Sequence, residues 1–228
     1  MARFWHLRWW VLARRHPSAW LLLAQLCGLL LYPALDGMPM GNVLVTIFGA
    51  IVLALALWVV SRSPTVAWLA WCLALPGATF SLLAAWRSDP QMLALGHVFE
   101  GALYFYTAAG LIAYMLQDHE VTSDELFAAG ATFTLLAWGF AFAFSVCQIL
   151  RPGSFVAAVH PEYQRSWIEL LSLSFSMLSG VGLSDIMPVR PGARALVMLS
   201  QFAGVMYIAL VVSRLIGLSI LRHGQRRP

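Results

Sequence analysis

The sequence predicts an all-α membrane protein with six transmembrane helices. Of its 228 residues, 61% are hydrophobic and only 11% are charged, whereas soluble domains carry roughly 25% charged residues. The apolar residues gather in six segments, each about as long as a helix that crosses the hydrocarbon layer of a bilayer. Connections rich in turn formers or charge separate these segments. They leave no stretch long enough for an additional soluble domain.

The six predicted spans lie at residues 17–35, 41–61, 64–86, 92–117, 124–150 and 194–219. The fifth should begin near Thr122, because Thr122-Ser123-Asp124-Glu125 has capping-box spacing just before an apolar run. Residues 1–16 mix arginine with tryptophan, which is typical of a helix that lies in the headgroup layer. We expect a passive anchor there rather than a sensor of anionic lipids. Residues 222–228 form a basic tail.

Arginine carries all of the basic charge, because the 14 basic residues include no lysine. With an even number of spans, both termini lie on one side of the membrane. That side would hold Arg3, Arg8, Arg14, Arg15, Arg62, Arg214, Arg222, Arg226 and Arg227, and the other side Arg87, Arg151, Arg165, Arg190 and Arg194. Because arginine-rich loops stay in the cytoplasm, we expect a multi-pass protein of the bacterial inner membrane with cytoplasmic termini. Its surface partner would be membrane lipid and not nucleic acid.

The cysteines and the N-terminus carry no sign of a redox, metal-binding or secretory role. Cys27, Cys72 and Cys147 each fall in an apolar segment without a CxxC motif or a His/Cys cluster. We interpret them as small buried hydrophobes and expect no cofactor and no resident metal. Arg14 and Arg15 interrupt the N-terminal apolar run, which does not fit a cleaved signal peptide.

The long connection between the fifth and sixth spans, residues 151–193, contains the most informative pattern. Its residues 163–179 are compatible with a helix, but that helix would be too short to cross the bilayer. A run of small residues, SGVGLSD at 179–185, follows it. Non-helical backbone at membrane depth survives only where it is buried in protein or lines water. We therefore expect a re-entrant helix whose returning segment lines a water-filled path.

This order of features resembles the pore module of the tetrameric potassium channels, whose filter reads T-T-V-G-Y-G-D-x-x-P. Aligned without gaps, residues 179–185 take the place of the seven-residue string and Pro188 that of its proline. Arg194 falls where these channels often have a basic residue at the start of the inner helix, and Gly204 falls where many have a hinge glycine. The resemblance covers about residues 124–219. The first four spans match the six-span members only in number and arrangement.

The resemblance implies a homotetramer in which four chains line one cation path. Carbonyl oxygens of the filter would replace the water shell of K⁺ or Na⁺, so no metal is expected other than permeant cations. Residues 122–221 would form the pore domain, with a pore helix at 163–179 and a filter at 180–184, and residues 17–121 a four-helix voltage-sensor-like domain. The expected ion-binding residues are Ser179, Gly180, Val181, Gly182, Leu183 and Ser184, with Glu169, Asp185 and Arg194 as filter support and Gly204 as gating hinge.

Three departures from the filter pattern predict weaker discrimination between potassium and sodium. Gly180 replaces a threonine, Leu183 replaces an aromatic residue, and Ser184 replaces the second glycine. In a left-handed conformation Ser184 would cost roughly 1–2 kcal/mol per chain, which favours a different local path. We therefore expect a channel for monovalent cations, with potassium the first candidate and reduced selectivity against sodium.

Ionisable residues inside the predicted helices leave alternatives open. His97 and Glu100 lie three apart on one helix face, as either a pH-sensitive pair near the ion path or a structural pair. Glu169 either supports the filter or pairs with Arg165 one turn away. Residues 92–117 contain no arginine or lysine, and voltage sensors need such charges. Strong voltage gating is therefore not expected.

Two other functional classes are weaker candidates. A serine hydrolase within the membrane, similar to the rhomboid-like proteases, would need a Gly-x-Ser-Gly motif and a histidine base on a neighbouring span. Met177 stands where that first glycine should be, before Ser179, and the last span has no histidine before His223. A non-conducting scaffold would not require a glycine-bearing re-entrant segment. The sequence predicts a channel and not an enzyme.

Overall fold

The computed structural model describes residues 17–35, 67–87, 89–117 and 123–225, together with Val52, Ala54, Leu55 and Trp58. The predicted interfacial helix at 1–16, most of the predicted span at 41–61 and the end of the basic tail lie outside the described residues. The described chain is all-helical apart from two strands of three residues each.

Six helices are described; they include the short helix expected in the long connection, and the predicted span at 41–61 is not among them, so the prediction of six spans stays a prediction. The helices are α2 (Pro17–Leu35), α4 (Ala67–Arg87), α5 (Pro90–Gln117), α6 (Ser123–Leu150), α7 (Trp167–Leu178) and α8 (Pro191–Gln225). Four of them, α4, α5, α6 and α8, are long and apolar enough to cross a membrane. A membrane protein with helical spans is therefore supported. The apolar part of α2, Ser18–Leu31, is shorter than a full span.

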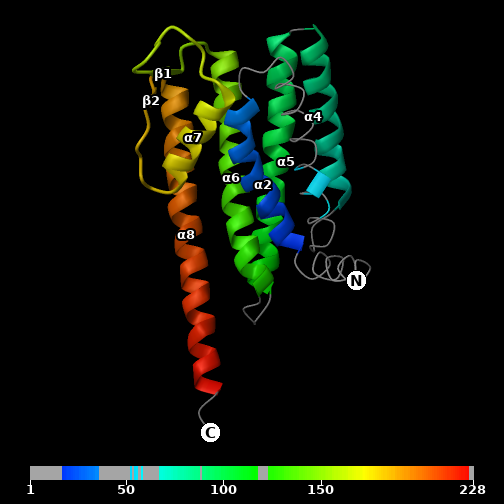
Figure 1. Ribbon diagram of the computed structural model, residues 1–228, viewed down its shortest axis with the longest axis vertical. Helices are drawn as coiled ribbons and strands as arrows, with labels where there is room; N and C mark the ends of the chain where they lie inside the picture. Colours follow the sequence, from blue (N-terminus) through cyan, green and yellow to red (C-terminus); the bar gives the residue numbers. More distant parts are fainter. Residues whose placement is uncertain are drawn as a thin grey trace.

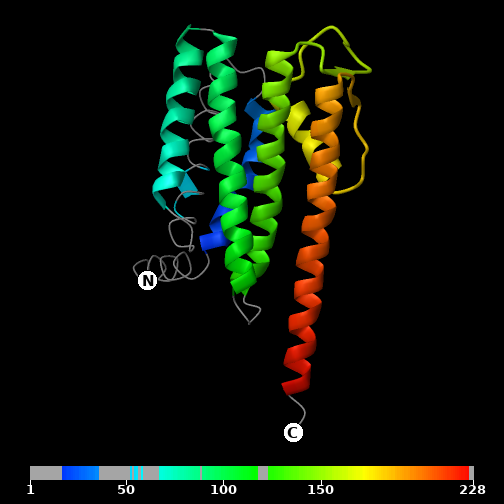
Figure 2. The ribbon, with the colours of Figure 1, turned by 180° about the vertical axis from the view of Figure 1, so that it is seen from behind.

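Helix α6 is the centre of the described structure, because it packs against α2, α5, α7 and α8. Helix α4 packs on the far side of α5, so that α4 and α8 lie at opposite edges (Figures 1 and 2). A buried apolar cluster joins α2, α5 and α6 around Leu21, Leu111 and Leu135. A second cluster lies beneath α7 around Phe144 and Leu173.

Polar contacts tie the helices together inside these apolar surfaces. On the α2 side, the Thr134 hydroxyl donates to Gln25 Oε1 at 2.5 Å. On the α8 side, the Tyr207 hydroxyl donates to the carbonyl of Ala129 at 2.5 Å. The Arg214 guanidinium also forms a 2.8 Å ion pair with Glu125. Such contacts are characteristic of helix association in a membrane, where burial of apolar surface alone does not distinguish a helix neighbour from lipid. They fix α8 along the side of α6.

A two-stranded antiparallel pair, which the sequence prediction missed, closes the long connection. Strand β1 (Phe155–Ala157) pairs with β2 (Ile186–Pro188), and Val156 stands opposite Met187. One step further, the Val189 amide donates to the Ser154 carbonyl at 2.9 Å. The pair therefore fastens the returning end of the connection to its beginning. Three-residue strands are too short to give a reliable alternating pattern in sequence.

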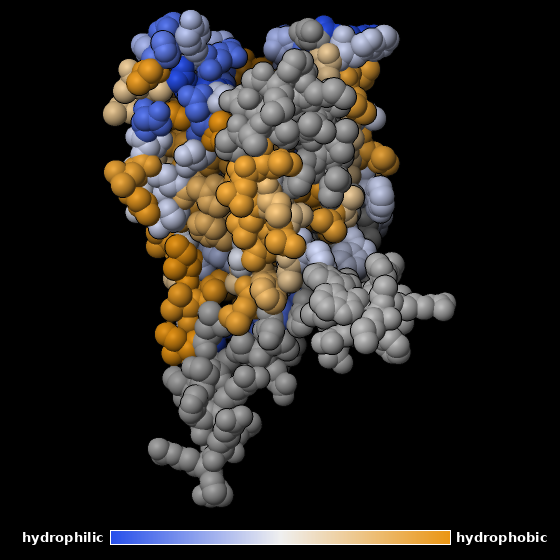
Figure 3. All heavy atoms as spheres, in the orientation of Figure 1, coloured by the Kyte–Doolittle hydropathy of each residue, from blue (hydrophilic) through white to orange (hydrophobic). Residues whose placement is uncertain are grey.

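Several arginines of the described chain lie at one end of the molecule. The C-terminal ends of α4 and α6 and the N-terminal end of α8 all lie at that end (Figure 1), which places Arg87, Arg151, Arg190 and Arg194 there. In Figure 3 hydrophilic residues gather over this end, whereas the flank below is mainly apolar. This grouping is the one that the predicted topology requires; which side of the membrane it faces stays a prediction.

Gly204 brings α8 into direct contact with the end of α7. A Cβ atom at Gly204 would lie 2.0 Å from the carbonyl oxygen of Leu178 and 2.6 Å from its Cα. Helix α8 continues without interruption through Gly204. The structure therefore gives this glycine a packing role, and the hinge that we expected from the resemblance stays a prediction.

We predict that Gly204→Ala destabilises the fold although alanine is the better helix former. Because the added methyl group meets backbone, α7 or α8 must shift, which costs about 1–3 kcal/mol in the free energy of unfolding. Gly192→Ala on the same helix is the matched control, since a Cβ at Gly192 meets nothing within 4 Å. Thermal and denaturant unfolding in detergent would measure both. Equal stability of the two variants would contradict the close contact.

Candidate functional site

A capping box formed by Ser166 and Glu169 marks the N-terminus of the short helix α7. The Ser166 hydroxyl accepts from the Glu169 amide at 3.4 Å, and Glu169 Oε2 accepts from the Ser166 amide at 2.6 Å. The box satisfies two backbone donors of the first turn. Helix α7 therefore starts at Trp167, four residues later than the predicted 163, and its 12 residues span about 18 Å.

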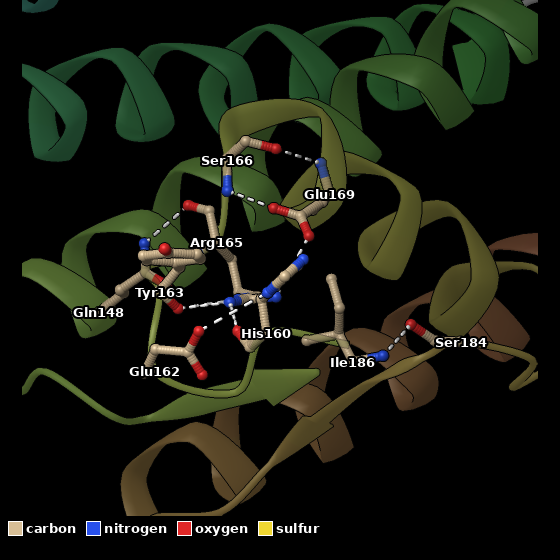
Figure 4. A network of polar contacts seen from close by, with 9 residues as sticks. All are labelled: Gln148, His160, Glu162, Tyr163, Arg165, Ser166, Glu169, Ser184 and Ile186. Carbon is tan, nitrogen blue, oxygen red and sulfur yellow. Dashed lines mark hydrogen bonds and ion pairs between the residues drawn. The ribbon is translucent and has the colours of Figure 1, made fainter. Parts of the chain in front are cut away.

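Arg165 explains the later start, because its side chain organises residues 160–165 as a loop (Figure 4). The buried guanidinium donates to the carbonyl of His160 at 2.6 Å and to that of Tyr163. It also forms a 3.3 Å ion pair with Glu169. Both backbone groups of Arg165 bond to the side chain of Gln148 on α6, at 2.8 and 2.9 Å.

Of the two roles considered for Glu169, the structure shows the pairing with Arg165. Its carboxylate is taken up by Arg165 and by the capping box at the first turn of α7. The SGVGLSD segment leaves the opposite end of the helix. Among the described residues the Glu169 carboxylate bonds to Arg165 and Ser166 and not to the segment, so any support that it gives is indirect, through the position of α7. Gln148, which sequence reasoning missed, has the same indirect role from α6.

The end of α7 lies deep in the structure. Its last residue, Leu178, touches Gly204, and Gly204 follows the start of α8 at Pro191 by 13 residues, or about 20 Å of helix. A hydrocarbon core is about 30 Å thick. From the end of α7, residues 179–185 return along the outer edge of the molecule to β2, at the end from which α7 started (Figure 1). The chain thus enters and leaves at one end.

Two glycines shape the returning segment. Gly180 and Gly182 have φ angles of +75° and +70°, a region in which other residues are strained. The Gly180 amide donates to the Met177 carbonyl at 3.2 Å, and the Gly182 amide donates to the Ser176 carbonyl at 3.1 Å. The segment therefore turns back closely against the C-terminal end of α7.

The backbone at Ser184 is not in the left-handed conformation, as we expected for a residue with a side chain. Among the described residues other than glycine, only His160 has a positive φ, so Ser184 avoids that strain. Its hydroxyl instead accepts from the Ile186 amide at 3.1 Å, a local turn that serine favours. The Leu183 carbonyl accepts from the Ser176 hydroxyl at 2.5 Å. This oxygen, expected to belong to a ladder of ion ligands, thus points to its own chain.

Three backbone oxygens of the segment have no partner within the described part of the chain. The carbonyls of Gly180, Val181 and Gly182 accept no hydrogen bond there. The side chains beside them are uncovered as well, with Val181 62% and Leu183 80% exposed. The single chain therefore presents a row of polar backbone on its own surface, next to the end of α7 that contacts Gly204.

Asp185 and Arg194 hold the upper end of the segment. The Asp185 carbonyl accepts from the Ala158 amide at 3.3 Å, and Arg194 Nε donates to the Pro188 carbonyl at 3.2 Å. Arg194 thus links the first turn of α8 to β2. Asp185 takes part through its backbone while its side chain is exposed, and the supporting role expected for both residues stays a prediction.

His97 and Glu100 face different helices. His97 Nδ1 lies 3.0 Å from the Ser145 hydroxyl of α6, and its ring centroid lies 6.1 Å from that of Trp167 at the start of α7. Glu100 instead accepts a 2.7 Å hydrogen bond from Ser81 on α4. The expected contact between the two side chains is thus replaced by one contact to each neighbouring helix. This arrangement fits a structural role.

Comparison with known protein families, characterised proteins and solved structures gives no match to this chain. The functional assignment therefore depends on the geometry of residues 176–189 and on the sequence resemblance.

Proposed function

We propose that this chain is one subunit of a homotetrameric membrane channel for monovalent cations, with residues 180–184 as its ion-selective segment. One observation carries the proposal: Gly180, Val181 and Gly182 are exposed, and their carbonyl oxygens accept no hydrogen bond from the described part of the chain, next to the end of α7 that meets Gly204. Each uncompensated backbone group costs several kcal/mol in hydrocarbon. A membrane protein keeps such a row only against water, ions or another chain.

Cations are the ligands that suit this row. Carbonyl oxygens coordinate K⁺ and Na⁺ in place of water. The C-terminal end of α7 lies beside the same segment and carries the negative pole of the helix dipole, which favours cations over anions. One chain has the segment on an outer surface and encloses nothing. Fourfold symmetry, as in the potassium channels that the sequence resembles, would place four segments around one axis.

The alternatives fit the same geometry less well. A serine hydrolase needs a base within hydrogen-bond reach of its nucleophile. The Ser179 hydroxyl instead donates to the Ser176 carbonyl at 3.1 Å, and His97 contacts Ser145. A non-conducting scaffold would leave the exposed carbonyl row without a purpose.

We further propose that the channel resides in the cell membrane with cytoplasmic termini and is not strongly gated by voltage. The described helix α5 (Pro90–Gln117) contains no arginine or lysine. One elementary charge that crosses the membrane field is worth about 2.3 kcal/mol per 100 mV. Without such charges on α5, this helix cannot supply the work that steep voltage gating requires.

Reconstituted protein should conduct potassium and, less well, sodium, but not chloride. The matched variants are Gly182→Ala and Gly192→Ala, because a Cβ meets nothing within 4 Å at either position, and only Gly182 has a φ of +70°. Gly182→Ala should reduce potassium flux in liposomes, since its strain of roughly 1–2 kcal/mol per chain acts on the ion path. Gly192→Ala should not. Chloride flux, or the absence of any flux, would contradict the proposal.

A second prediction concerns selectivity. The change Leu183→Tyr with Ser184→Gly restores two residues of the potassium-channel pattern and leaves Gly180 as it is, because threonine would be strained at its φ of +75°. We expect the native chain to admit sodium more readily than this double variant, since a less confined set of oxygens discriminates less. Reversal potentials under bi-ionic conditions measure the ratio. If the native chain already excludes sodium equally well, its selectivity is not weakened.

A further inference from the structure

Three serines at alternate positions of α7 have three different environments. Ser172 is exposed to the outside of the chain. Ser174 is buried and donates to the Ala137 carbonyl of α6 at 2.7 Å. Ser176 faces the returning segment and donates to the Leu183 carbonyl at 2.5 Å. The sequence SLSFS shows the alternation but does not distinguish their roles.

Ser176 contacts three residues of the segment: Ser179, Gly182 and Leu183. Its carbonyl accepts from the Ser179 hydroxyl and from the Gly182 amide, each at 3.1 Å, while its own hydroxyl reaches the carbonyl of Leu183. Because Ser176 lies in the last turn of α7, its carbonyl has no partner within the helix. The Ser179 hydroxyl and the Gly182 amide of the segment provide the donors that this carbonyl lacks within the helix.

We propose that Ser176 is the positioning residue of the ion-selective segment, an inference that rests on the proposed channel function. Its hydroxyl holds the Leu183 oxygen toward α7 and thereby leaves the oxygens of residues 180–182 as the outward row. Leu183 lacks an aromatic side chain and its polar tip, and Ser184 is no glycine. The hydrogen bond from the Ser176 hydroxyl to the Leu183 carbonyl therefore holds the segment in place, which the side chains of Leu183 and Ser184 do not do.

The same bonds prepare the Ser179 oxygen for a cation. Its hydroxyl proton is directed to the Ser176 carbonyl, so the lone pairs of the oxygen remain available on the other side. Ser179 itself is exposed. Ser176 thus orients both the innermost side-chain oxygen and the backbone oxygens above it.

The test compares Ser176→Ala with Ser176→Thr, Ser172→Ala and Ser174→Ala in liposomes. Removing the Ser176 hydroxyl should lower the potassium-to-sodium permeability ratio roughly fivefold, the change expected from the loss of one neutral hydrogen bond. Ser176→Thr should retain the native ratio because it keeps the hydroxyl. Ser172→Ala should behave like the native chain. Ser174→Ala should lower thermal stability without altering the ratio, which separates packing of α7 from positioning.

A conducting Ser176→Ala protein with the native permeability ratio would overturn this inference while leaving the proposed function intact. A native protein that conducts no cation would contradict the proposed function itself. If Ser176→Ala does not assemble, the nearly isosteric pair Ser176→Thr and Ser176→Val provides the same comparison. Equal ratios in that pair would also overturn the inference.

Discussion

The structure is organised around a single constraint: the backbone between Leu178 and Ile186 is not helical, and it begins beside Gly204, about 20 Å along α8 from the start of that apolar helix. Each of its polar groups must find a partner or a polar medium. Ser176 and the end of α7 provide partners on one side. Gly204 lets α8 approach so closely that α7 can end there, and the β1–β2 pair returns the chain to the polar end. The carbonyl oxygens of Gly180, Val181 and Gly182 accept no hydrogen bond from the described residues, and the proposed function depends on this feature.

Helix α6 connects the elements around this segment to the rest of the molecule. Along its length it holds the loop before α7 through Gln148, contacts His97 of α5 through Ser145, and pairs with Arg214 of α8 through Glu125. Glu125 belongs to the first turn of α6, whereas Gln148 belongs to its last. Arg214 is thus joined to the first turn of the helix whose last turn holds the loop before α7, so a movement of α8 relative to α6 would have to break a largely buried ion pair, which is costly.

Long apolar runs made the helices predictable, and their described bounds lie within a few residues of the expected ones except where α8 continues to Gln225. Contacts between distant residues were not predictable. Arg165 delays the start of α7 because it binds backbone carbonyls of its own loop, and the short strands depend on pairing across 30 residues. SGVGLSD marked the site through its glycines. Ser176 stayed unnoticed, because nothing in sequence tells which serine of α7 faces the segment.

The central claim is that four chains share one axis lined by residues 180–184, and images of single particles in lipid nanodiscs test it most directly. The account predicts a fourfold ring in which the exposed row of Gly180, Val181 and Gly182 oxygens faces the axis and Leu183 is covered by a neighbouring chain. A monomer, or a twofold particle with these oxygens against lipid, would contradict it.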